Sequence, residues 1–298
     1  MAAALPFRLS QGALLLRGEP LAPLTSFKIG GPAELLLLPA SEGDVRRGVE
    51  HAAASGTPWR VIGSGTNILV PDAGLPGLTI KLWKRFDDIA VAGATLRARA
   101  GATMWAAASA AADAGLSGLE FGCGIPGTVG GAVFMNAGDR EWEIRDVLLA
   151  AAVLGRDGVV RSRAAADLGL RYRGSALHED GGVVLAAEFG LRKGDTETIV
   201  GEMNRRLEER RRRQPLDEPN CGSVFRNPHG DFAGRLIEEA GCKGLGRGGV
   251  RVSELHANFM VNIGGGRAAD VLALIGEVRR RVSAKFGVEL ELELRVLN

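Results

Sequence analysis

The sequence predicts a mixed α+β fold with more than one domain. Its 298 residues are close to the length at which a single hydrophobic core divides. The first two-thirds of the chain combines short apolar runs, glycine-rich turns and a few amphipathic helices. The remainder contains a long helix and then a segment in which apolar and polar residues alternate. These three observations favour separate α+β domains.

The elements of the first two-thirds can be placed from local signals. Ser41 and Asp44 resemble a capping box that opens a helix, and Gly56 would end that helix. A second helix should run from about Thr103 to Asp113, with Gly115 as its C-terminal stop. Four apolar runs are typical of strands: residues 60–62, 79–82, 96–100 and 183–191.

A long charged helix over 196–213 ends before Pro215, and a new pattern begins beyond it. We therefore expect a domain boundary near residue 200, with one region at 1–200, divided into subdomains of about 1–85 and 86–200, and a C-terminal domain at 201–298. A further helix over 268–286 has an apolar stripe that should face the core: Val271, Leu274, Ile275, Val278, Val282 and Phe286.

The C-terminal segment has the period of two that is typical of a strand. Five apolar residues would share one face: Val288, Leu290, Leu292, Leu294 and Val296. The opposite face would carry Glu289, Glu291, Glu293 and Arg295. A carboxylate-rich face of this kind looks toward either solvent or a functional site.

Composition excludes several classes of protein. The 37 basic and 35 acidic residues give a net charge of +2, which is too balanced for a nucleic-acid binder. The arginines at 205, 206 and 210–213 alternate with glutamates, as on a solvated helix face. Three cysteines without a CxxC pair favour a reducing cytoplasm. Residues 1–7 lack the basic start of a signal peptide, and no run of about 18 apolar residues predicts membrane insertion.

The first glycine-rich loop lies between two apolar runs at Gly63, Ser64, Gly65, Thr66 and Asn67. Glycine allows positive φ, so successive N–H groups can face an anion, and the Ser, Thr and Asn side chains add donors. A pyrophosphate is the natural ligand for such a loop. A plain hairpin turn is an equally good interpretation of this segment alone.

The second glycine-rich segment spans 122–132 and formally matches GxGxxG. A dinucleotide-binding fingerprint requires a preceding strand and a following helix. No apolar strand precedes this segment, and Gly130 with Gly131 should break a helix. The segment instead suits an extended, glycine-lined wall against a large flat ligand. Walker, HExxH and paired-cysteine patterns are absent, and the four histidines are scattered, so we expect no metal site.

Five ordered motifs together resemble the UDP-N-acetylenolpyruvoylglucosamine reductase family, a branch of the vanillyl-alcohol-oxidase-type FAD folds. They are Thr25–Ala33, the Gly63 loop, the segment from Gly124 to Gly138 that ends in Met135-Asn136-Ala137-Gly138, Tyr172-Arg173-Gly174-Ser175, and Cys221–Pro228. The resemblance extends to the terminal strand and covers nearly the whole chain. It implies a PCMH-like FAD-binding fold of two subdomains and a C-terminal α+β substrate-binding domain.

The resemblance also implies the cofactor and the reaction. FAD would be held noncovalently by the Gly63–Asn67 loop, which would contact the pyrophosphate, and by Gly127, Thr128, Gly130, Gly131 and Ala132. Neither loop contains a histidine that could tether FAD. NADPH would reduce FAD, and UDP-N-acetylglucosamine enolpyruvate would then be reduced to UDP-N-acetylmuramate in peptidoglycan synthesis. We expect a cytoplasmic monomer.

Three residues match the catalytic positions of the family. Ser223 would protonate the substrate carbon, and Arg173 would bind the enolpyruvyl carboxylate. Glu293 would assist electrophilic activation or proton delivery. Each has an ordinary structural interpretation, as a turn serine, a surface cation and an exposed strand carboxylate, and the strand pattern alone cannot choose among the three glutamates. Cys221 is a weaker candidate for a nucleophile, since no histidine lies near it in sequence.

The substrate-binding positions carried over from the family are Tyr172, Asn227 and Lys243, with His256 a weaker candidate. Tyr172 is the only tyrosine of the chain, so the resemblance is to the branch that lacks the tyrosine-bearing loop of other members. Two other functions remain open: an oxidase or dehydrogenase of the same FAD fold, and a noncatalytic module that binds a UDP-sugar.

Overall fold

The computed structural model describes residues 8–298, so the expectation about a signal peptide at 1–7 lies outside the described residues. By its internal contacts the chain forms two compact units, each made of several stretches of sequence. The larger unit consists of the chain up to Arg17, Glu34–Ser64 and Gly77–Leu207. The smaller unit consists of Gly18–Ala33, Gly65–Pro76 and Glu208–Asn298.

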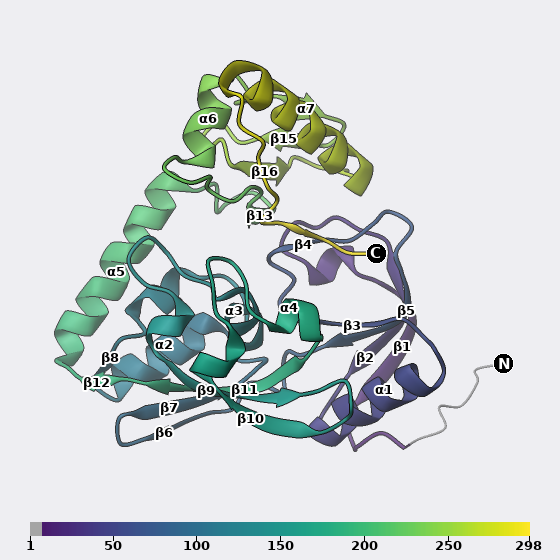
Figure 1. The fold of residues 1–298 in the computed structure, drawn as a ribbon, viewed down its shortest axis with the longest axis vertical. Helices are drawn as coiled ribbons and strands as arrows, with labels where there is room; N and C mark the ends of the chain where they lie inside the picture. Colours follow the sequence, from purple (N-terminus) through teal and green to yellow (C-terminus); the bar gives the residue numbers. More distant parts are fainter. Residues whose placement is uncertain (1–7) are drawn as a thin grey trace. The chain divides into compact units, whose positions relative to one another are not determined.

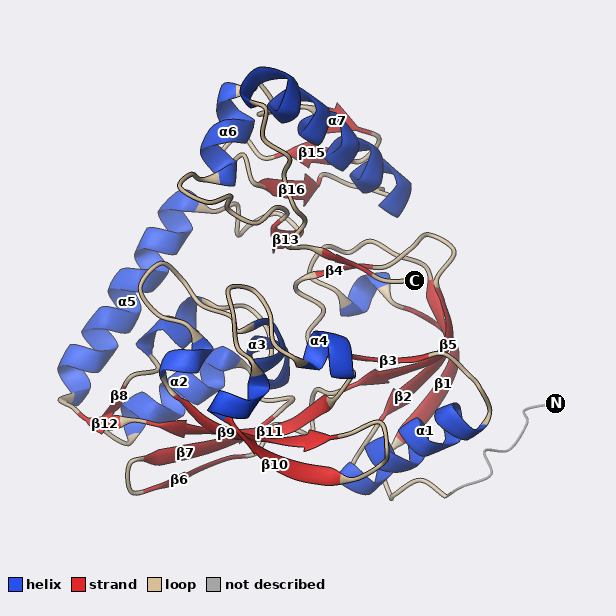
Figure 2. Cartoon of the chain, viewed as in Figure 1, coloured by secondary structure: helices blue, strands red, loops and turns tan. Residues whose placement is uncertain are grey.

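The larger unit contains a five-stranded antiparallel sheet. In spatial order its strands are β10 (Val160–Ala164), β9 (Leu148–Leu154), β11 (Val183–Gly190), β7 (Thr95–Arg99) and β6 (Ile89–Ala92). Helices α2 (Met104–Asp113) and α3 (Val129–Met135) pack on one face of this sheet (Figures 1 and 2). The alanines of α2 allow that close approach, since Ala107, Ala108 and Ala111 are fully buried.

A second sheet has the strand order β1-β2-β5-β3. Its strands are β1 (Leu14–Pro20), β2 (Pro32–Leu38), β5 (Leu75–Lys81) and β3 (Trp59–Ile62). Helix α1 (Glu42–Ala54) packs beside β3, and its N-terminus has the expected capping box of Ser41 and Asp44. Helix α2 likewise begins after Thr103, which caps it.

The larger unit is completed by shorter elements. They are β8 (Leu116–Ser117) paired with β12 (Arg192–Lys193), the 3-10 helices Glu120–Gly124, Ile144–Asp146 and Ala165–Leu168, and α4 (Leu177–Asp180). The long helix α5 (Thr196–Arg213) continues past the end of this unit at Leu207. Arg212 with Glu208 and Arg213 with Glu209 form exposed ion pairs one helical turn apart, in agreement with a solvated charged face. Arg206 departs from that expectation, because only 12% of its side chain is exposed and it pairs with Asp139 and Glu141 as well as with Glu202.

The smaller unit contains a four-stranded sheet (Figure 2). In spatial order its strands are β13 (Asn220–Ser223), β16 (Phe259–Asn262), β15 (Val250–Val252) and β14 (Gly246–Arg247). Helices α6 (Ala233–Glu239) and α7 (Ala268–Phe286) pack against each other, and α7 contacts β14 and β15. The predicted stripe of α7 is buried from Val271 to Val282, and Phe286 at its end is half-buried. The unit also contains the 3-10 helix Ala22–Leu24 and the parallel pair β4 (Ile68–Leu69) and β17 (Arg295–Val296).

The expectation of one continuous strand over 288–296 is wrong. Only an isolated bridge between Leu292 and Phe225 and the two-residue strand β17 form there. The N–H groups of Glu293 and Leu294 both donate to the carbonyl of Val224, at 2.9 and 3.2 Å, which breaks the one-to-one register. Leu290 and Leu294 are buried as predicted, but Val296 is exposed.

The contact-defined units divide the chain differently from a single boundary near residue 200. Gly18–Ala33 and Gly65–Pro76 belong with the C-terminal part of the chain. Ser26 Oγ donates a 2.7 Å hydrogen bond to the Asn220 carbonyl. The carboxylate of Asp72 accepts from the first amides of α7, those of Ala268 and Ala269, at 2.8 and 3.0 Å. These long-range contacts explain why two early segments join the smaller unit.

Across residues 8–298, none of the helices is both long enough and apolar enough to span a bilayer.

Candidate active site

The Gly63–Asn67 loop connects β3 to β4. The hairpin interpretation is excluded, because β3 pairs in parallel with β5 whereas β4 pairs in parallel with β17. Gly65 has φ of 70°, a conformation that disfavours any residue with a Cβ. Gly63 does not have positive φ, contrary to expectation; it is required because a Cβ there would lie 2.3 Å from Thr128 Oγ1. The two glycine-rich segments therefore pack directly against each other.

In this loop several of the backbone carbonyls have hydrogen-bond partners within the protein, whereas several of the backbone amides have none among the described residues. The carbonyl of Gly63 accepts from Lys81, that of Gly65 from Ser26 and that of Asn67 from Arg295. Within residues 8–298, the N–H groups of Ser64, Gly65 and Asn67 have no protein acceptor. A run of amides left available for a ligand is the arrangement that binds phosphate oxygens. The loop thus fits the pyrophosphate of FAD.

The second glycine-rich segment is not an extended wall. A 3-10 helix at Glu120–Gly124 includes its first residues, where a dinucleotide fingerprint requires the end of a strand, so the Rossmann interpretation is excluded. The expectation that Gly130 and Gly131 would break a helix is wrong, because both lie within α3. A Cβ on Gly130 would lie 2.8 Å from the Cβ of Ala100, so glycine lets the helix approach β7 closely. Packing explains Gly130, whereas a Cβ on Gly131 would meet nothing closer than Thr128 Oγ1 at 3.6 Å.

Thr128 caps α3, and its Oγ1 accepts from the Gly131 amide at 3.4 Å. The amides of Val129 and Gly130 donate to the carbonyls of Ala102 and Ala100, at 2.8 and 2.9 Å. Three amides at the start of α3 are therefore already used within the protein. These three amides are therefore not available to a ligand. The segment would contact a ligand through its shape and its side chains.

Arg173 occupies a strained position in a tight turn. Arg171 and Gly174 exchange two backbone hydrogen bonds of 2.9 and 3.0 Å, which leaves Tyr172 and Arg173 as the central residues. Arg173 has φ of 53°, which is uncommon for a residue other than glycine. Strain of this kind persists only where the surroundings hold the residue, and it is concentrated at functional sites. Tyr172 is 42% exposed, so its ring is accessible.

The Arg173 guanidinium is held from the segment that follows α3. Its Nη2 donates to the Gly138 carbonyl at 3.1 Å, and its Nη1 lies 3.9 Å from Glu143 Oε1. Glu143 Oε2 accepts from Asn136 Nδ2 at 3.0 Å, and the same Nδ2 donates to the Arg171 carbonyl at 3.1 Å. Arg173 is therefore not a surface cation: only 16% of its side chain is exposed.

Ser223 ends β13 directly after a bulge. Gly222 has φ of 76°, its amide donates to Asn220 Oδ1 at 2.9 Å, and the pairing with β16 shifts register between Asn220 and Ser223. The half-buried Ser223 hydroxyl makes no hydrogen bond to any other described residue. It is consequently available to a bound molecule.

Cys221 lies two residues before Ser223 and is fully buried. Burial, with a smaller contribution from the charge of Glu293, raises the pKa of its thiol to about 12. The thiol stays protonated near neutral pH, so Cys221 is unsuited to act as a nucleophile.

The structure distinguishes the three C-terminal glutamates. Glu289 and Glu291 are exposed; the first contacts Ser283, and the second lies 3.7 Å from Arg226. Glu293 is half-buried, and its amide donates to the carbonyl of Val224, the residue after Ser223. Glu293 is therefore the glutamate whose backbone pairs beside the serine.

The substrate-binding candidates of the smaller unit lie around α6. Asn227 Oδ1 accepts from the first helical amide, that of Ala233, at 3.0 Å. A Cβ on Gly234 would lie 3.3 Å from the His256 ring, so His256 packs on the same turn of the helix. Lys243 is not part of this group, because it follows the other end of α6 and pairs with Glu238 at 2.8 Å.

Sequence reasoning missed Lys81, Asn136 and Glu143. Lys81 could have been found, since it stands inside an apolar run and is buried in the structure. Asn136 stands in the Met135-Asn136-Ala137-Gly138 motif but received no role, and Glu143 gave no signal. Their importance arises from contacts with a turn some 30 residues further along the chain, at Arg171 and Arg173.

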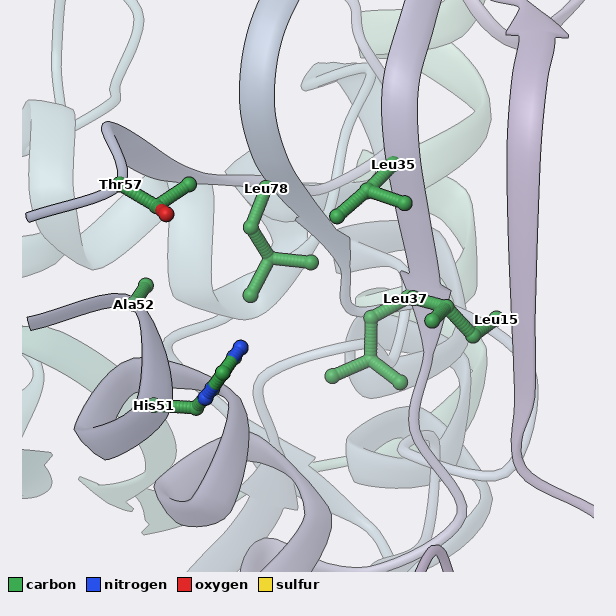
Figure 3. A pocket seen from close by; sticks show the side chains of 7 residues that line it. All are labelled: Leu15, Leu35, Leu37, His51, Ala52, Thr57 and Leu78. Atoms are coloured by element: carbon green, nitrogen blue, oxygen red, sulfur yellow. The ribbon is translucent and has the colours of Figure 1, made fainter. Parts of the chain in front are cut away.

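A small pocket in the larger unit lies between α1 and the β1-β2-β5-β3 sheet (Figure 3). Its lining is apolar apart from His51 and Thr57, and it consists of those two residues with Leu15, Leu35, Leu37, Ala52 and Leu78. The pocket includes no residue of either glycine-rich segment. It lies where helix packs on sheet and is not part of the candidate active site.

Two family models match the chain. The model described as FAD binding domain matches residues 33–163, and the model described as UDP-N-acetylenolpyruvoylglucosamine reductase, C-terminal domain, matches residues 214–297. The chain also resembles curated proteins named UDP-N-acetylenolpyruvoylglucosamine reductase. It is 50% identical to that of Rubrobacter xylanophilus over 94% of both chains. It is 44% identical to that of Heliobacterium modesticaldum over 95% of this chain and 90% of the other.

Solved structures agree with these matches. The crystal structure of UDP-N-acetylenolpyruvylglucosamine reductase (MurB) from Thermus caldophilus superposes with a TM-score of 0.82 and 38% identity, over 96% of this chain and 99% of that one. A 6-hydroxy-D-nicotine oxidase from Arthrobacter nicotinovorans is 21% identical and shares the fold alone, with a TM-score of 0.50 over 64% of this chain and 44% of that one.

The FAD-binding fold, with its amide-lined loop and a second α+β unit, defines a flavin-dependent oxidoreductase of the PCMH-like class. The identity of 50% over almost the full length of a named relative also establishes the family within that class. The chain belongs to the UDP-N-acetylenolpyruvoylglucosamine reductase family.

Proposed function

We propose that this reductase uses NADPH to convert UDP-N-acetylglucosamine enolpyruvate into UDP-N-acetylmuramate, a step of peptidoglycan synthesis. The observation that carries the proposal is the pairing of Glu293 with the residue after Ser223, together with a serine hydroxyl that has no described protein partner. The smaller unit thus carries both a proton donor, Ser223, and a carboxylate, Glu293, on two backbone segments that pair with each other. The family relatives support the substrate.

FAD would be held noncovalently by Gly63, Ser64, Gly65, Thr66 and Asn67. The available amides of this loop support contact with the pyrophosphate. The segment with Gly127, Thr128, Gly130, Gly131 and Ala132 packs on the loop through Thr128 and would add the second contact surface. FAD, when bound, supplies the two-electron chemistry that links NADPH to the vinyl group.

The protein's own residues would bind the substrate and manage its charge and proton. Arg173, oriented by Gly138 and Glu143, would bind the enolpyruvyl carboxylate and stabilise the charge that develops beside it. Ser223 would donate a proton to the substrate carbon through its available hydroxyl. Glu293 would assist by holding or replacing that proton.

Recognition of the sugar nucleotide would use Tyr172, Asn227 and His256, with Lys243 as a further cation. The exposed ring of Tyr172 and the grouping of Asn227 with His256 at the start of α6 support these assignments. Lys243 rests only on its match to the family position, and its ion pair with Glu238 would have to open.

In functional terms, residues 1–200 would form the FAD-binding region and residues 201–298 the substrate-binding domain. We place the enzyme in the cytoplasm, as a monomer. Its product would serve cell-wall biogenesis, and through it cell shape and cell division.

An NADPH oxidation assay with and without the UDP-enolpyruvyl sugar tests the proposal. Oxidation that depends on the sugar nucleotide is the expected result, with UDP-N-acetylmuramate identified by mass spectrometry. Equal oxidation in its absence would instead indicate an oxidase of the same fold. A purified protein without flavin absorbance would indicate a noncatalytic binding module.

A further inference from the structure

Lys81, the last residue of β5, is a buried cation next to the proposed pyrophosphate loop. Only 3% of the residue is exposed, and its Nζ donates a 2.7 Å hydrogen bond to the carbonyl of Gly63. Lysine is almost never fully buried without a specific interaction, because its charge must leave water. The position of Lys81 therefore calls for a role.

The hydrogen bond to Gly63 fixes the direction of a peptide group. In a trans peptide the C=O of one residue and the N–H of the next point in opposite directions. When Lys81 holds the Gly63 carbonyl, the Ser64 amide is directed away from the ammonium. That amide is one of those with no acceptor among the described residues.

The peptide after Gly65 is fixed in the same way, since the Gly65 carbonyl accepts from the Ser26 amide at 3.1 Å. Gly63 is also confined on its other side, where Thr128 Oγ1 leaves no room for a Cβ. The loop is thus held by its carbonyls and its packing. The amides of Ser64, Gly65 and Asn67 remain for a ligand.

We infer that Lys81 is a positioning residue for the diphosphate of FAD: it orients the Gly63–Ser64 peptide and places a positive charge behind the loop. This inference rests on the proposed role of the Gly63–Asn67 loop. It predicts that Lys81 affects binding of a flavin that carries a diphosphate, and has little effect on a flavin that lacks one.

A matched pair of lysines gives the test. Lys81 and Lys84 both lie over the ring of Trp83, at 5.0 and 5.2 Å from its centroid, but Lys84 is exposed. Lys81→Met removes the donor and the charge, and Lys84→Met removes a neighbouring charge only. Lys81→Gln keeps a neutral donor, so it separates the hydrogen bond from the charge.

Dissociation constants of the deflavinated proteins are measured for FAD and for riboflavin by quenching of flavin fluorescence. Lys81→Met should weaken FAD binding about 10- to 100-fold, the scale of a charge-assisted hydrogen bond, and change riboflavin binding less than about twofold. Lys84→Met should bind both as the parent does. Circular dichroism establishes that each apoprotein is folded, and Lys81→Gln replaces Lys81→Met should the latter fail to fold.

Unchanged FAD affinity in a folded Lys81 variant, or an equal loss for riboflavin, would overturn the inference. Gly65→Val in the same assay separates this outcome from failure of the loop assignment. If Gly65→Val loses FAD and the Lys81 variants do not, only the role of Lys81 is wrong. If none of them loses FAD, the loop assignment itself fails.

Discussion

The amide of Glu293 donates a 2.9 Å hydrogen bond to the carbonyl of Val224, and Val224 follows Ser223 in the chain. Two proposed proton-handling residues are thereby related through backbone pairing, not through a flexible side-chain contact. The bulge at Gly222 sets where Ser223 stands in this arrangement. Backbone-supported geometry is the kind that keeps catalytic groups positioned before substrate arrives.

Ser223→Ala should affect only the step that needs a proton on carbon. NADPH should still remove the flavin absorbance at the parental rate, because that step does not use the serine proton. Its return on anaerobic addition of the enolpyruvyl sugar should slow by at least about 10²- to 10⁴-fold, as expected for loss of a general acid. Rapid-mixing spectroscopy on each half-reaction measures both rates.

Ser223→Cys is the companion variant, since a thiol is a stronger acid than a hydroxyl but places its proton differently. Partial rescue is expected. Parental return of absorbance in Ser223→Ala would make Ser223 an ordinary turn residue and remove the catalytic assignment.

Glu293→Gln and Glu291→Gln form a matched pair from the same segment. Glu293 is half-buried beside the Ser223 strand, whereas 78% of the Glu291 side chain is exposed. We expect Glu293→Gln to slow the substrate-driven half-reaction by about 10²-fold or more, and Glu291→Gln to change it less than about twofold. Similar rates in the two variants would show that the carboxylate at 293 has no special role.

Gly65→Val should reduce flavin occupancy of the purified protein. Valine strongly disfavours φ of 70°, and its Cβ would lie 2.9 Å from the Leu24 carbonyl. The 450 nm to 280 nm absorbance ratio measures occupancy. Gly93→Val is the control, because Gly93 has φ of 60° with open space around it and lies in the β6–β7 turn. A full flavin complement in Gly65→Val would remove the structural argument for this loop.

The sequence predicted correctly those features of the fold that depend on interactions between residues close together in the chain. The capping box of α1, the extent of α2, the positive φ of Gly65 and the buried stripe of α7 all depend on residues within a few positions of each other. The same reasoning failed at Gly130 and Gly131, because the close approach of α3 to Ala100 outweighs the helix-breaking tendency of glycine.

Long-range contacts account for the other differences. Position 63 requires glycine because Thr128 leaves no room for a Cβ. The predicted C-terminal strand is interrupted because two successive amides donate to the Val224 carbonyl. Neither partner is adjacent in sequence. The five motifs contain most of the candidate site residues, although Lys243, His256 and Glu293 lie outside them. They gave no sign of the contacts that orient Arg173.

Asp44→Asn should lower stability at neutral pH and weaken its acid dependence. Burial acts to raise the pKa of Asp44, but hydrogen bonds from the Ser10 amide, Ser41 and Arg47 outweigh it and lower the pKa to about 2. The carboxylate therefore stabilises the fold above the unfolded pKa near 4, and this contribution is lost as pH falls toward 2. It amounts to about 2 kcal/mol.

Urea unfolding at several pH values between 7 and 2.5 measures this effect, with Asp157→Asn as the control. The pKa of Asp157 is also lowered to about 2, through its hydrogen bond with Arg161, but both side chains are exposed. Asp157→Asn should change stability little. If the parent and Asp44→Asn lose stability in parallel as pH falls, the buried carboxylate is not the source of the acid dependence.

Glu143→Gln tests whether the network around Arg173 positions it. The glutamate and arginine side chains are only 12% and 16% exposed, so their 3.9 Å separation is weakly screened. Glutamine keeps the size of the residue and can still accept from Asn136, but it removes the negative charge that lies 3.9 Å from the Arg173 guanidinium, and with it the 2.9 Å ion pair to the half-exposed Arg145. It also removes a competitor for that guanidinium. Substrate affinity should therefore be retained or increased while the rate falls.

The substrate-driven return of flavin absorbance in Glu143→Gln should slow about tenfold, with NADPH-driven loss of absorbance and FAD affinity unchanged. Glu188→Gln is the matched control, because its partner Arg97 is 3.5 Å away and both side chains are about half exposed. A purely structural role for Glu143 would lower both half-reactions and the thermal midpoint together. A parental rate would show that Gly138 and the turn alone suffice to orient Arg173. If Glu143 is a positioning residue, only the substrate-driven half-reaction should slow. The variant should then bind the sugar nucleotide at least as tightly as the parent does.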